Sequence, residues 1–155
     1  MNQGDFYHRA LQTYTKTFEE MTQVNFREKL AVCFSEDARF KDPFNDVKGH
    51  ESILAVFEHM YATLDSPEFQ IQSALLEGDK GYIDWRFFFR IGHDGYSQVI
   101  EGMSRVRFDE EGRCKEHIDF WDSGEYVYRK VPLLGWFNNL VAKKLSANQQ
   151  SKLSD

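Results

Sequence analysis

The chain has 155 residues, the size of one ordinary domain. Its 19 Lys and Arg residues are outnumbered by 25 Asp and Glu residues, so the formal net charge at pH 7 is -6. This acidic balance argues against a nucleic-acid partner. Hydrophobic residues make up 41% of the chain and aromatic residues 15%. The composition excludes a disordered chain, and the aromatic rings belong either to a large core or to a pocket.

The sequence also argues against several cellular contexts. It contains no apolar run of about 18 residues, the length that spans a bilayer. Its first residues lack the basic and apolar regions of a secretion signal. The two cysteines, Cys33 and Cys114, are too few for a disulfide framework and match no metal-ligand spacing. We therefore expect a cytoplasmic protein with two reduced thiols, no metal site and no membrane span.

The first part of the chain has helical periodicity. Apolar residues recur every three or four positions in segments that begin near Phe6, Asn25 and Gly49. Asn25 and Glu28 have the spacing of a capping box at the start of the second helix. Between the second and third helices, a short extended stretch is expected over residues 38–42. The first helix has an apolar face of Phe6, Ala10, Leu11, Tyr14, Phe18 and Met21, and the third has Ile53, Leu54, Phe57, Met60, Tyr61 and Leu64.

After Pro67 the period changes from that of a helix to that of a strand. Four strand-like runs follow, over residues 69–77, 81–91, 96–109 and 114–121. The connections are short and contain turn residues such as Asp94-Gly95, a strong hairpin signal. Short connections require antiparallel neighbours. Helices followed by a four-stranded meander predict an α+β fold in which the helices cover one face of a sheet.

Alternation along the runs separates an inner from an outer sheet face. In the second run, Trp85, Phe87 and Phe89 share the face without charges. In the last run, His117 and Asp119 lie on the same side as Trp121. If the tryptophan is inside, an imidazole and a carboxylate are inside with it. Buried charge is costly unless it is paired or functional, so this pair marks a candidate site.

Two strings of residues carry a family resemblance. The first is the segment 34–44 (FSEDARFKDPF) followed by Gly49, and the second is the segment 107–113 (RFDEEGR) followed by HIDFWD at 117–122. Both resemble the NTF2-like superfamily, and within it the SnoaL-like polyketide cyclases and the ketosteroid isomerases. The resemblance implies an α+β, cystatin-like cone, in which N-terminal helices pack in the concavity of a curved antiparallel sheet around a pocket. We expect one such domain over residues 1–131, and a C-terminal amphipathic helix with a polar tail over residues 132–155.

The resemblance also implies candidate site residues. Asp42 falls where ketosteroid isomerases carry their catalytic base, and His117 and Asp119 fall on pocket-facing positions of the last strand. Phe18 and Ser104 stand where those isomerases carry their hydrogen-bond donors, so a true steroid isomerase is not expected. The expected ligand-binding residues are Tyr14, Phe18, Phe57, Met60, Trp85, Phe87, Phe89, Ser104 and Trp121.

The function expected from these residues is the binding of a small, largely apolar organic molecule. If the protein is an enzyme, the resemblance points to proton-transfer isomerisation, cyclisation or dehydration without a cofactor. Asp42 would be the base, and His117 and Asp119 its proton partner and orienting group. Alternatively, the protein is a non-catalytic binding or interaction module of the same fold. The residues leave open that Asp42 only accepts backbone N–H groups in a turn, and that His117 and Asp119 only satisfy each other.

The outer sheet face and the C-terminal segment are expected to make contacts with other molecules. Family members often form homodimers through the outer sheet face, which here would bear Phe88, Met103, Ile118 and Phe120. Trp136 and Phe137 begin the predicted C-terminal helix. That helix would cover the pocket mouth or the neighbouring subunit, or bind a membrane surface or another partner.

Overall fold

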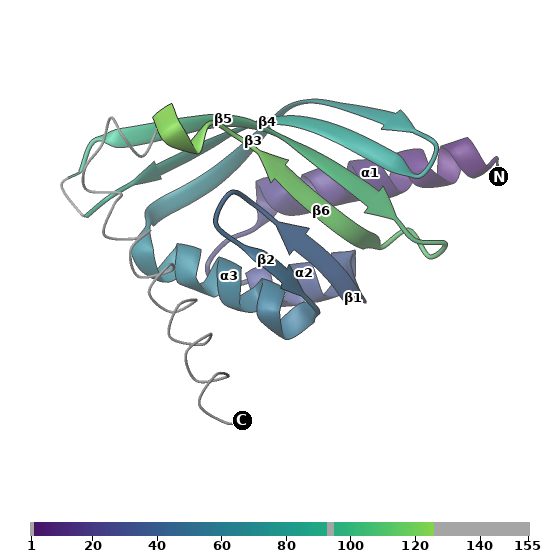
Figure 1. The fold of residues 1–155 in the computed structure, drawn as a ribbon, viewed down its shortest axis with the longest axis horizontal. Coiled ribbons are helices and arrows are strands. Elements are labelled where there is room, and N and C mark those ends of the chain that lie inside the picture. The colour runs from purple at the N-terminus through teal and green to yellow at the C-terminus, as the bar shows by residue number, and fades with distance from the viewer. Residues whose placement is uncertain (1, 93–94, 126–155) are drawn as a thin grey trace, which may run out of the picture. The chain divides into compact units, whose positions relative to one another are not determined.

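The computed structural model describes residues 2–92 and 95–125 (Figure 1). The chain separates into two units, residues 1–121 and residues 122–155, and each is described by itself. In the second unit, the described residues form a single helical turn in which the Glu125 amide donates a hydrogen bond to Oδ1 of Asp122 at 3.0 Å. The predicted C-terminal helix with Trp136 and Phe137, and Asp94 of the predicted hairpin turn, lie outside the described residues.

The first unit begins with two helices, α1 (Gln3–Glu20) and α2 (Phe26–Cys33), and a third, α3 (His50–Thr63), follows later. The predicted inner face of α3 is buried as expected. On α1 the inner face is rotated slightly, so that Tyr7 is buried in place of Phe6. The predicted capping box is wrong, because Asn25 already has helical backbone angles. Its Oδ1 accepts instead from the Thr22 amide at 2.7 Å.

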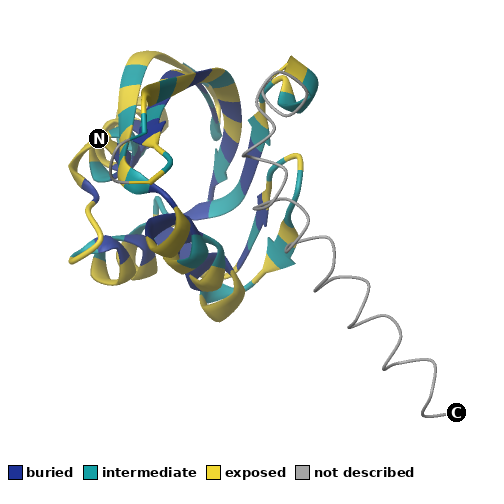
Figure 2. Ribbon diagram, turned by 90° about the vertical axis from the view of Figure 1, so that its left-hand side faces the viewer, coloured by how far each residue is buried: buried dark blue, intermediate teal, exposed yellow. Residues whose placement is uncertain are grey.

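Six strands form one curved, unclosed sheet on which the helices pack (Figures 1 and 2). The strands are β1 (Phe34–Lys41), β2 (Asp46–Lys48), β3 (Asp65–Glu77), β4 (Lys80–Arg90), β5 (Ser97–Phe108) and β6 (Cys114–Phe120). Their order is β2-β1-β6-β5-β4-β3, which confirms the predicted meander of the last four strands.

The sheet is mixed rather than purely antiparallel. The stretch expected to be short is the full strand β1, and it pairs in parallel with β6, so that Phe40 lies beside His117. Strand β2, which the sequence did not predict, pairs antiparallel with the edge of β1 that faces away from β6. Pro67 lies inside β3 and does not end the region before it. The pairing of β3 with β4 shifts register around this proline, between Asp65 and Glu68, as bulged strands do.

The predicted face assignment of the sheet is correct. Trp85, Phe87 and Phe89 are buried on the inner face, as are Ile100, Ser104 and Val106 of the next strand. Together with the inward side chains of α1 and α3 they form the core seen as dark bands in Figure 2. The aromatic residues that stood out in the composition therefore concentrate between the helices and the sheet.

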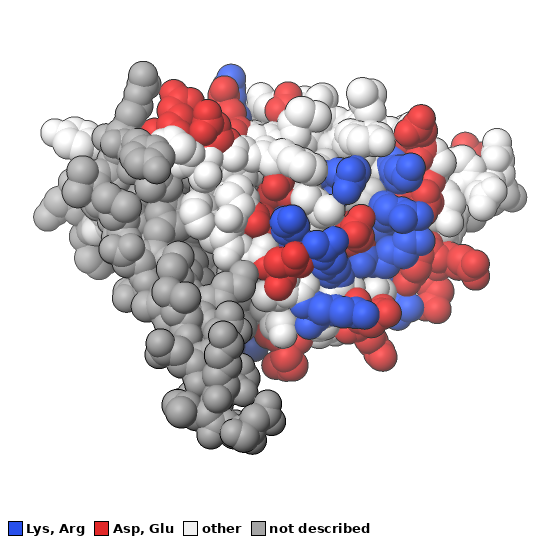
Figure 3. Space-filling view, viewed as in Figure 1, with Lys and Arg blue, Asp and Glu red and all other residues white. Residues whose placement is uncertain are grey.

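The outer sheet face exposes apolar residues among charges. Met103 and Phe120 are cross-strand partners and are 50% and 53% exposed. Ile118, expected on the same surface, is only 8% exposed. It lies between Arg105 and Lys41 in the two ladders, and flanking long side chains of this kind can cover a β-branched residue. Figure 3 shows Lys and Arg side chains intermixed with Asp and Glu on the face viewed in Figure 1.

Candidate functional site

A chain of hydrogen bonds runs through the interior from α1 to the last strand. The Tyr14 hydroxyl bonds to Nδ1 of His117 at 2.8 Å. Nε2 of His117 lies 2.7 Å from Oδ1 of Asp119. The same Oδ1 accepts the hydroxyl of Ser104 at 2.5 Å, and Ser104 in turn accepts the indole N–H of Trp85 at 2.8 Å. Five residues from four elements thus form one connected buried polar network.

Strand register brings these side chains together. Ser104 on β5 and Asp119 on β6 are direct cross-strand partners, and Val106 and His117 are the next such pair on that face. Trp85 on β4 lies opposite Gly102 on β5. Residues two apart on a strand share a face, so the two adjacent ladders place a hydroxyl, a carboxylate and an imidazole side by side.

The His117 ring is enclosed by aromatic rings. It stacks on Phe40 with centroids 4.9 Å apart and an interplanar angle of 20°. It also stacks on the Phe18 ring, with centroids 5.7 Å apart and an interplanar angle of 22°. The ring centroid of Phe57 lies 5.4 Å from that of Phe40 and 5.9 Å from that of Phe18. Stacking holds the plane of the imidazole, and within that plane Nδ1 faces Tyr14 and Nε2 faces Asp119.

The hydrogen inventory of this network assigns the direction of each bond. Burial raises the pKa of Tyr14 well above its ordinary value, and nearby Cys114, Cys33 and Asp119 contribute in the same direction. Tyr14 therefore keeps its proton and donates a hydrogen bond to Nδ1 of His117. Nδ1 is then the acceptor of the ring, and Nε2 carries a ring hydrogen, which it donates to Oδ1 of Asp119.

Asp42 adopts the turn conformation that the sequence left open. Its Oδ1 accepts the backbone amides of Phe44 at 2.7 Å and Asn45 at 2.6 Å. The Asn45 side chain also donates to Oδ1 at 3.1 Å and to Oδ2 at 2.9 Å. Burial raises the pKa of Asp42, the bonds from Asn45 and Phe44 oppose this shift, and the charge of Asp119 adds to it. The carboxyl is thus held rigidly and near Asp119.

Two contacts join the loop after β1 to the end of β6. One is the strand register: Lys41 lies opposite Ile118, so Asp42 and Asp119 are the next residues along these paired strands, and the charge of Asp119 raises the pKa of Asp42. The other is the contact of the Phe44 and Trp121 rings, whose centroids are 5.3 Å apart. Both rings are half-buried. Two carboxyls and two aromatic rings therefore lie at the same end of the sheet, which we call the Asp42–Asp119 end.

Asp119 is the residue of the polar network that is most accessible to solvent. Its side chain is 16% exposed, whereas that of His117 is 5% exposed, and Tyr14, Trp85 and Ser104 are buried. Its Oδ2 receives no hydrogen bond from residues 2–92 and 95–125. The network therefore ends on a carboxylate oxygen with free acceptor capacity at the Asp42–Asp119 end.

The remaining predicted ligand residues occupy the core. Phe57, Met60, Phe87 and Phe89 are all buried. Phe87 and Phe89 stack at 5.2 Å along β4, and Phe69, which the sequence analysis did not select, stacks on Phe87 at 4.5 Å. Of the predicted set, the structure brings Tyr14, Phe18, Trp85 and Ser104 into direct contact with His117 or into its hydrogen-bond network.

Two residues around the network were missed by the sequence analysis. Phe40 stacks on His117, but its position followed only from the parallel pairing of β1 with β6, which local periodicity does not report. Gly102 lies under the Trp85 indole, where a Cβ atom would stand 2.5 Å from Cη2 of the ring. A glycine inside an otherwise regular strand was the available signal, because it marks a close approach.

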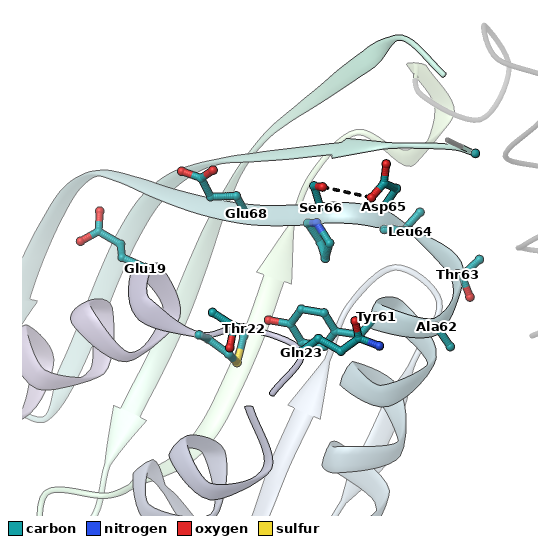
Figure 4. A pocket seen from close by; sticks show the side chains of 13 residues that line it. Glu19, Thr22, Gln23, Tyr61, Ala62, Thr63, Leu64, Asp65, Ser66 and Glu68 are labelled. Carbon is teal, nitrogen blue, oxygen red and sulfur yellow. Dashed lines mark hydrogen bonds between the residues drawn. The ribbon is translucent and has the colours of Figure 1, made fainter. Parts of the chain in front are cut away.

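Besides a pocket of about 980 Å³ lined by the start of α1, residues 74–76 and Lys115, two pockets lie on the described surface of the unit, and none of the three is lined by Asp42 or Asp119. One, of about 840 Å³, lies between α1, α2 and the turn after β5, and Tyr14, Cys33 and Arg113 contribute to its lining. The other, of about 750 Å³, lies where α1 and α3 end beside the start of β3 (Figure 4).

The acidic residues of the second pocket have structural partners. Glu19 accepts the Ile71 amide at 3.1 Å, and Asp65 pairs with Arg90 at 3.0 Å. In Figure 4 the Ser66 hydroxyl points to Asp65, to which it bonds at 3.0 Å. The Asp42–Asp119 end is the stronger site, because its carboxylates combine burial with a free oxygen.

The described residues form neither a cluster of metal ligands nor a membrane-spanning helix. Across 2–92 and 95–125, no three His, Cys, Asp or Glu side chains come together as ligands for a metal ion. None of the helices described is long and apolar enough to cross a membrane. Cys33 and Cys114 are free thiols.

Comparison with known proteins identifies the family. The family model described as a SnoaL-like domain matches residues 12–117, so the chain belongs to the SnoaL-like family and has the NTF2-like fold, as the sequence resemblance predicted. A search of curated protein sequences found no match.

Solved structures with low sequence identity share the fold. An NTF2-like protein of unknown function from Burkholderia pseudomallei superposes with a TM-score of 0.67 at 14% identity, covering 83% of this chain and 97% of that one. TerC, crystallised with polyporic acid, gives 0.66 at 12% identity, covering 78% and 95%. An LEH-like epoxide hydrolase from M. tuberculosis gives 0.61 at 13% identity, covering 76% and 84%.

Proposed function

We propose that the protein binds a small, largely apolar organic molecule at the Asp42–Asp119 end and catalyses a proton transfer on it. Asp42 is the base, and the His117–Asp119 pair is its proton partner and orienting group. The reaction class is isomerisation, cyclisation or dehydration next to a carbonyl or hydroxyl, without a cofactor. The observation that carries the proposal is the buried polar network that ends on the free oxygen of Asp119, beside the fixed carboxyl of Asp42.

The chemistry of these groups suits proton transfer. A raised pKa makes the Asp42 carboxylate a stronger proton acceptor than an exposed one. Oδ1 holds the turn amides, which leaves Oδ2, with its single bond from Asn45, as the oxygen that accepts a substrate proton. The proton on Asp42 then passes to the Asp119 carboxylate, which accepts it and releases it to a second atom of the same molecule, so that both carboxylates are regenerated and no proton is gained or lost. His117 keeps the Asp119 carboxylate in place.

The comparisons and the arginine positions bear on the substrate class. One protein of the same fold was crystallised with an organic molecule bound. Another is an epoxide hydrolase, a reaction for which this fold would need an arginine between two carboxylates. Here Arg86, Arg90 and Arg105 are exposed on the outer sheet face. The site therefore favours acid–base chemistry between carboxyls.

The experiment that tests this proposal measures proton exchange directly. Wild type is incubated in D2O with a panel of cyclic ketones and β-hydroxy ketones, and exchange or water loss is followed by proton NMR. Replacing Asp42→Asn or Asp119→Asn should slow the reaction of any responsive compound by about 100-fold or more, as for a lost acid–base group. Asp84→Asn, an exposed carboxylate of β4, is the matched control. Unchanged rates in both site variants would contradict the mechanism.

A specific observation also favours binding without turnover as the second candidate. Every polar group of the network except Oδ2 of Asp119 already has a partner within it, and Asp42 is bound by its own turn. A network with only a structural role would have the same satisfied hydrogen bonds. Compounds that raise the melting temperature of wild type and Asp42→Asn equally, with no exchange in D2O, would favour a binding module.

We further propose that the protein is a cytoplasmic homodimer paired through the outer sheet face. The exposed, adjacent side chains of Met103 and Phe120 and the half-buried Phe88 support this surface. Val99, which is also exposed, belongs to it, whereas Ile118 contributes little. The two free cysteines agree with a reducing compartment.

A further inference from the structure

We propose that the free oxygen of Asp119 accepts a hydroxyl group of the ligand and that Trp85 positions Asp119 for this task, so that the site selects neutral alcohols over ketones and carboxylates. The inference rests on the proposed function, because it takes the Asp42–Asp119 end as the ligand site. It goes further by choosing between the carbonyl and the hydroxyl as the group that this end recognises.

Strand β5 has no side chain beside the Trp85 indole, because the residue there is Gly102. Trp85 faces Gly102 across the β4–β5 ladder. A Cβ atom on Gly102 would lie 2.5 and 2.6 Å from Cη2 and Cζ2 of the indole, far inside van der Waals contact. The backbone angles of Gly102 do not require glycine, since its φ is not positive. The glycine is therefore needed for space: it lets the indole lie across β5 and reach Ser104.

The indole then fixes the direction of hydrogen bonding. An indole N–H is a donor only, so Ser104 must accept from Trp85. The single hydrogen of the Ser104 hydroxyl is left for Oδ1 of Asp119. Trp85 occupies one of the two acceptor positions of the Ser104 oxygen and fixes that oxygen in place. This favours the arrangement in which the hydroxyl hydrogen points to Oδ1 of Asp119.

The opposite side of the network gives the same result. Tyr14 donates to His117, and His117 donates to the same Oδ1. Two donor chains therefore converge on one oxygen of Asp119. Oδ2 keeps its lone pairs, and Asp119 is the only member of the network with appreciable exposure. What this oxygen can bind is a hydrogen-bond donor.

Neighbouring charges narrow the class of ligand. Within the described ranges, neither Asp42 nor Asp119 forms an ion pair with Lys or Arg, and the two carboxyls repel each other. An anionic ligand would add a third negative charge in a partly buried site. A ketone offers only an acceptor to a site that already presents acceptors. A neutral alcohol on an apolar ring system meets both constraints, with Phe44 and Trp121 nearby to contact the ring.

The test compares ligands that differ only in this group. Isothermal titration calorimetry measures the dissociation constants of α-tetralol, α-tetralone and tetralin α-carboxylate with wild type. We expect the alcohol to bind about tenfold more tightly than the ketone, as for one hydrogen bond to a charged acceptor. The carboxylate should bind more weakly than both. Asp119→Asn should abolish the preference for the alcohol, because an amide can also donate to the ketone.

The role of Trp85 has its own variants. Trp85→Phe keeps an aromatic ring but lacks the N–H, Ser104→Ala removes the next link, and Gly102→Ala displaces the indole. Each should reduce the ratio of alcohol to ketone affinity by about threefold or more, while ketone affinity changes less. The matched control is Gly81→Ala, which also crowds an inner-face strand position but whose nearest neighbours would be Leu11 and Val106 rather than the indole. It should keep the wild-type ratio.

The outcomes separate the two proposals. Equal binding of alcohol and ketone to wild type would overturn this inference and leave the ligand site in place. Binding of none of the three compounds would overturn the proposed ligand site and this inference with it. A wild-type ratio in the folded Trp85→Phe, Ser104→Ala and Gly102→Ala variants would overturn the positioning role of Trp85.

Discussion

Replacing Gly102 with alanine tests the packing that holds the site. The new Cβ would stand 2.5 and 2.6 Å from two carbons of the Trp85 indole and 3.0 Å from the Phe120 carbonyl oxygen. Neither neighbour can give way easily, since one is a rigid buried ring and the other is backbone. The indole must move, and its hydrogen bond to Ser104 is lost.

The magnitude follows from these two effects. Overpacking of a core costs about 1–3 kcal/mol, and a lost buried hydrogen bond costs about 1 kcal/mol more. The lower entropy of the unfolded alanine chain returns about 0.4–1 kcal/mol. We therefore expect Gly102→Ala to lower the free energy of unfolding by about 2 kcal/mol, with urea denaturation as the assay. In two-dimensional NMR the indole N–H signal of Trp85 should move.

A double-mutant cycle isolates the clash. Phenylalanine at position 85 lacks the Cη2 and Cζ2 atoms that the new Cβ would meet. Gly102→Ala should therefore cost less in the Trp85→Phe background, with a coupling of about 1 kcal/mol or more. Gly81→Ala is the control, because there the Cβ meets only methyl ends of Leu11 and Val106, at 2.7 and 2.9 Å. Additive effects at Gly102 and Trp85 would refute the reasoning.

Three further predictions concern the site and the outer face. Tyr14→Phe leaves Nδ1 of His117 buried without its donor and should cost about 1–3 kcal/mol in urea unfolding, whereas Tyr82→Phe should cost little, because Tyr82 is half-buried and its hydroxyl makes an exposed bond to Glu77. Because burial raises the folded-state pKa of Asp42 above its ordinary 3.8, the stability of wild type relative to Asp42→Asn should be highest below that pH and fall as pH rises through the raised value; a flat or rising difference would contradict it. Met103→Glu should shift the protein from dimer to monomer in size-exclusion chromatography, and a wild type that is already monomeric would overturn the proposed dimer.

Local sequence patterns predicted most of the helices and the meander, because these depend on neighbouring residues. The alternation of Trp85, Phe87 and Phe89 follows from strand geometry alone, and burial confirms it. The same alternation placed His117 and Asp119 on one side of the last strand. Register then made Ser104 the partner of Asp119, and no periodicity reports register between strands.

The parallel pairing of β1 with β6 could not be predicted in this way. Residues 34–41 and 114–120 are far apart in the chain, and β1 has charged residues on its exposed side, so it looked like a brief extended stretch. Parallel strands require a long connection, and here the connection contains α3 and the other four strands of the same sheet. Only this pairing places Phe40 beside His117 and brings the loop of Asp42 to the end of β6.

That long-range pairing determines what the site can do. Asp42 comes from a turn whose own amides hold its carboxyl, and Asp119 comes from a strand whose neighbours hold its other oxygen. Each carboxyl is fixed by local bonds, so their mutual repulsion is not relieved by either side chain moving away. Two fixed carboxyls in a partly buried place are stabilised by a shared proton or by a ligand that donates hydrogen bonds. This arrangement is why we propose a ligand with a hydroxyl group, which would donate a hydrogen bond to carboxyls that cannot move apart.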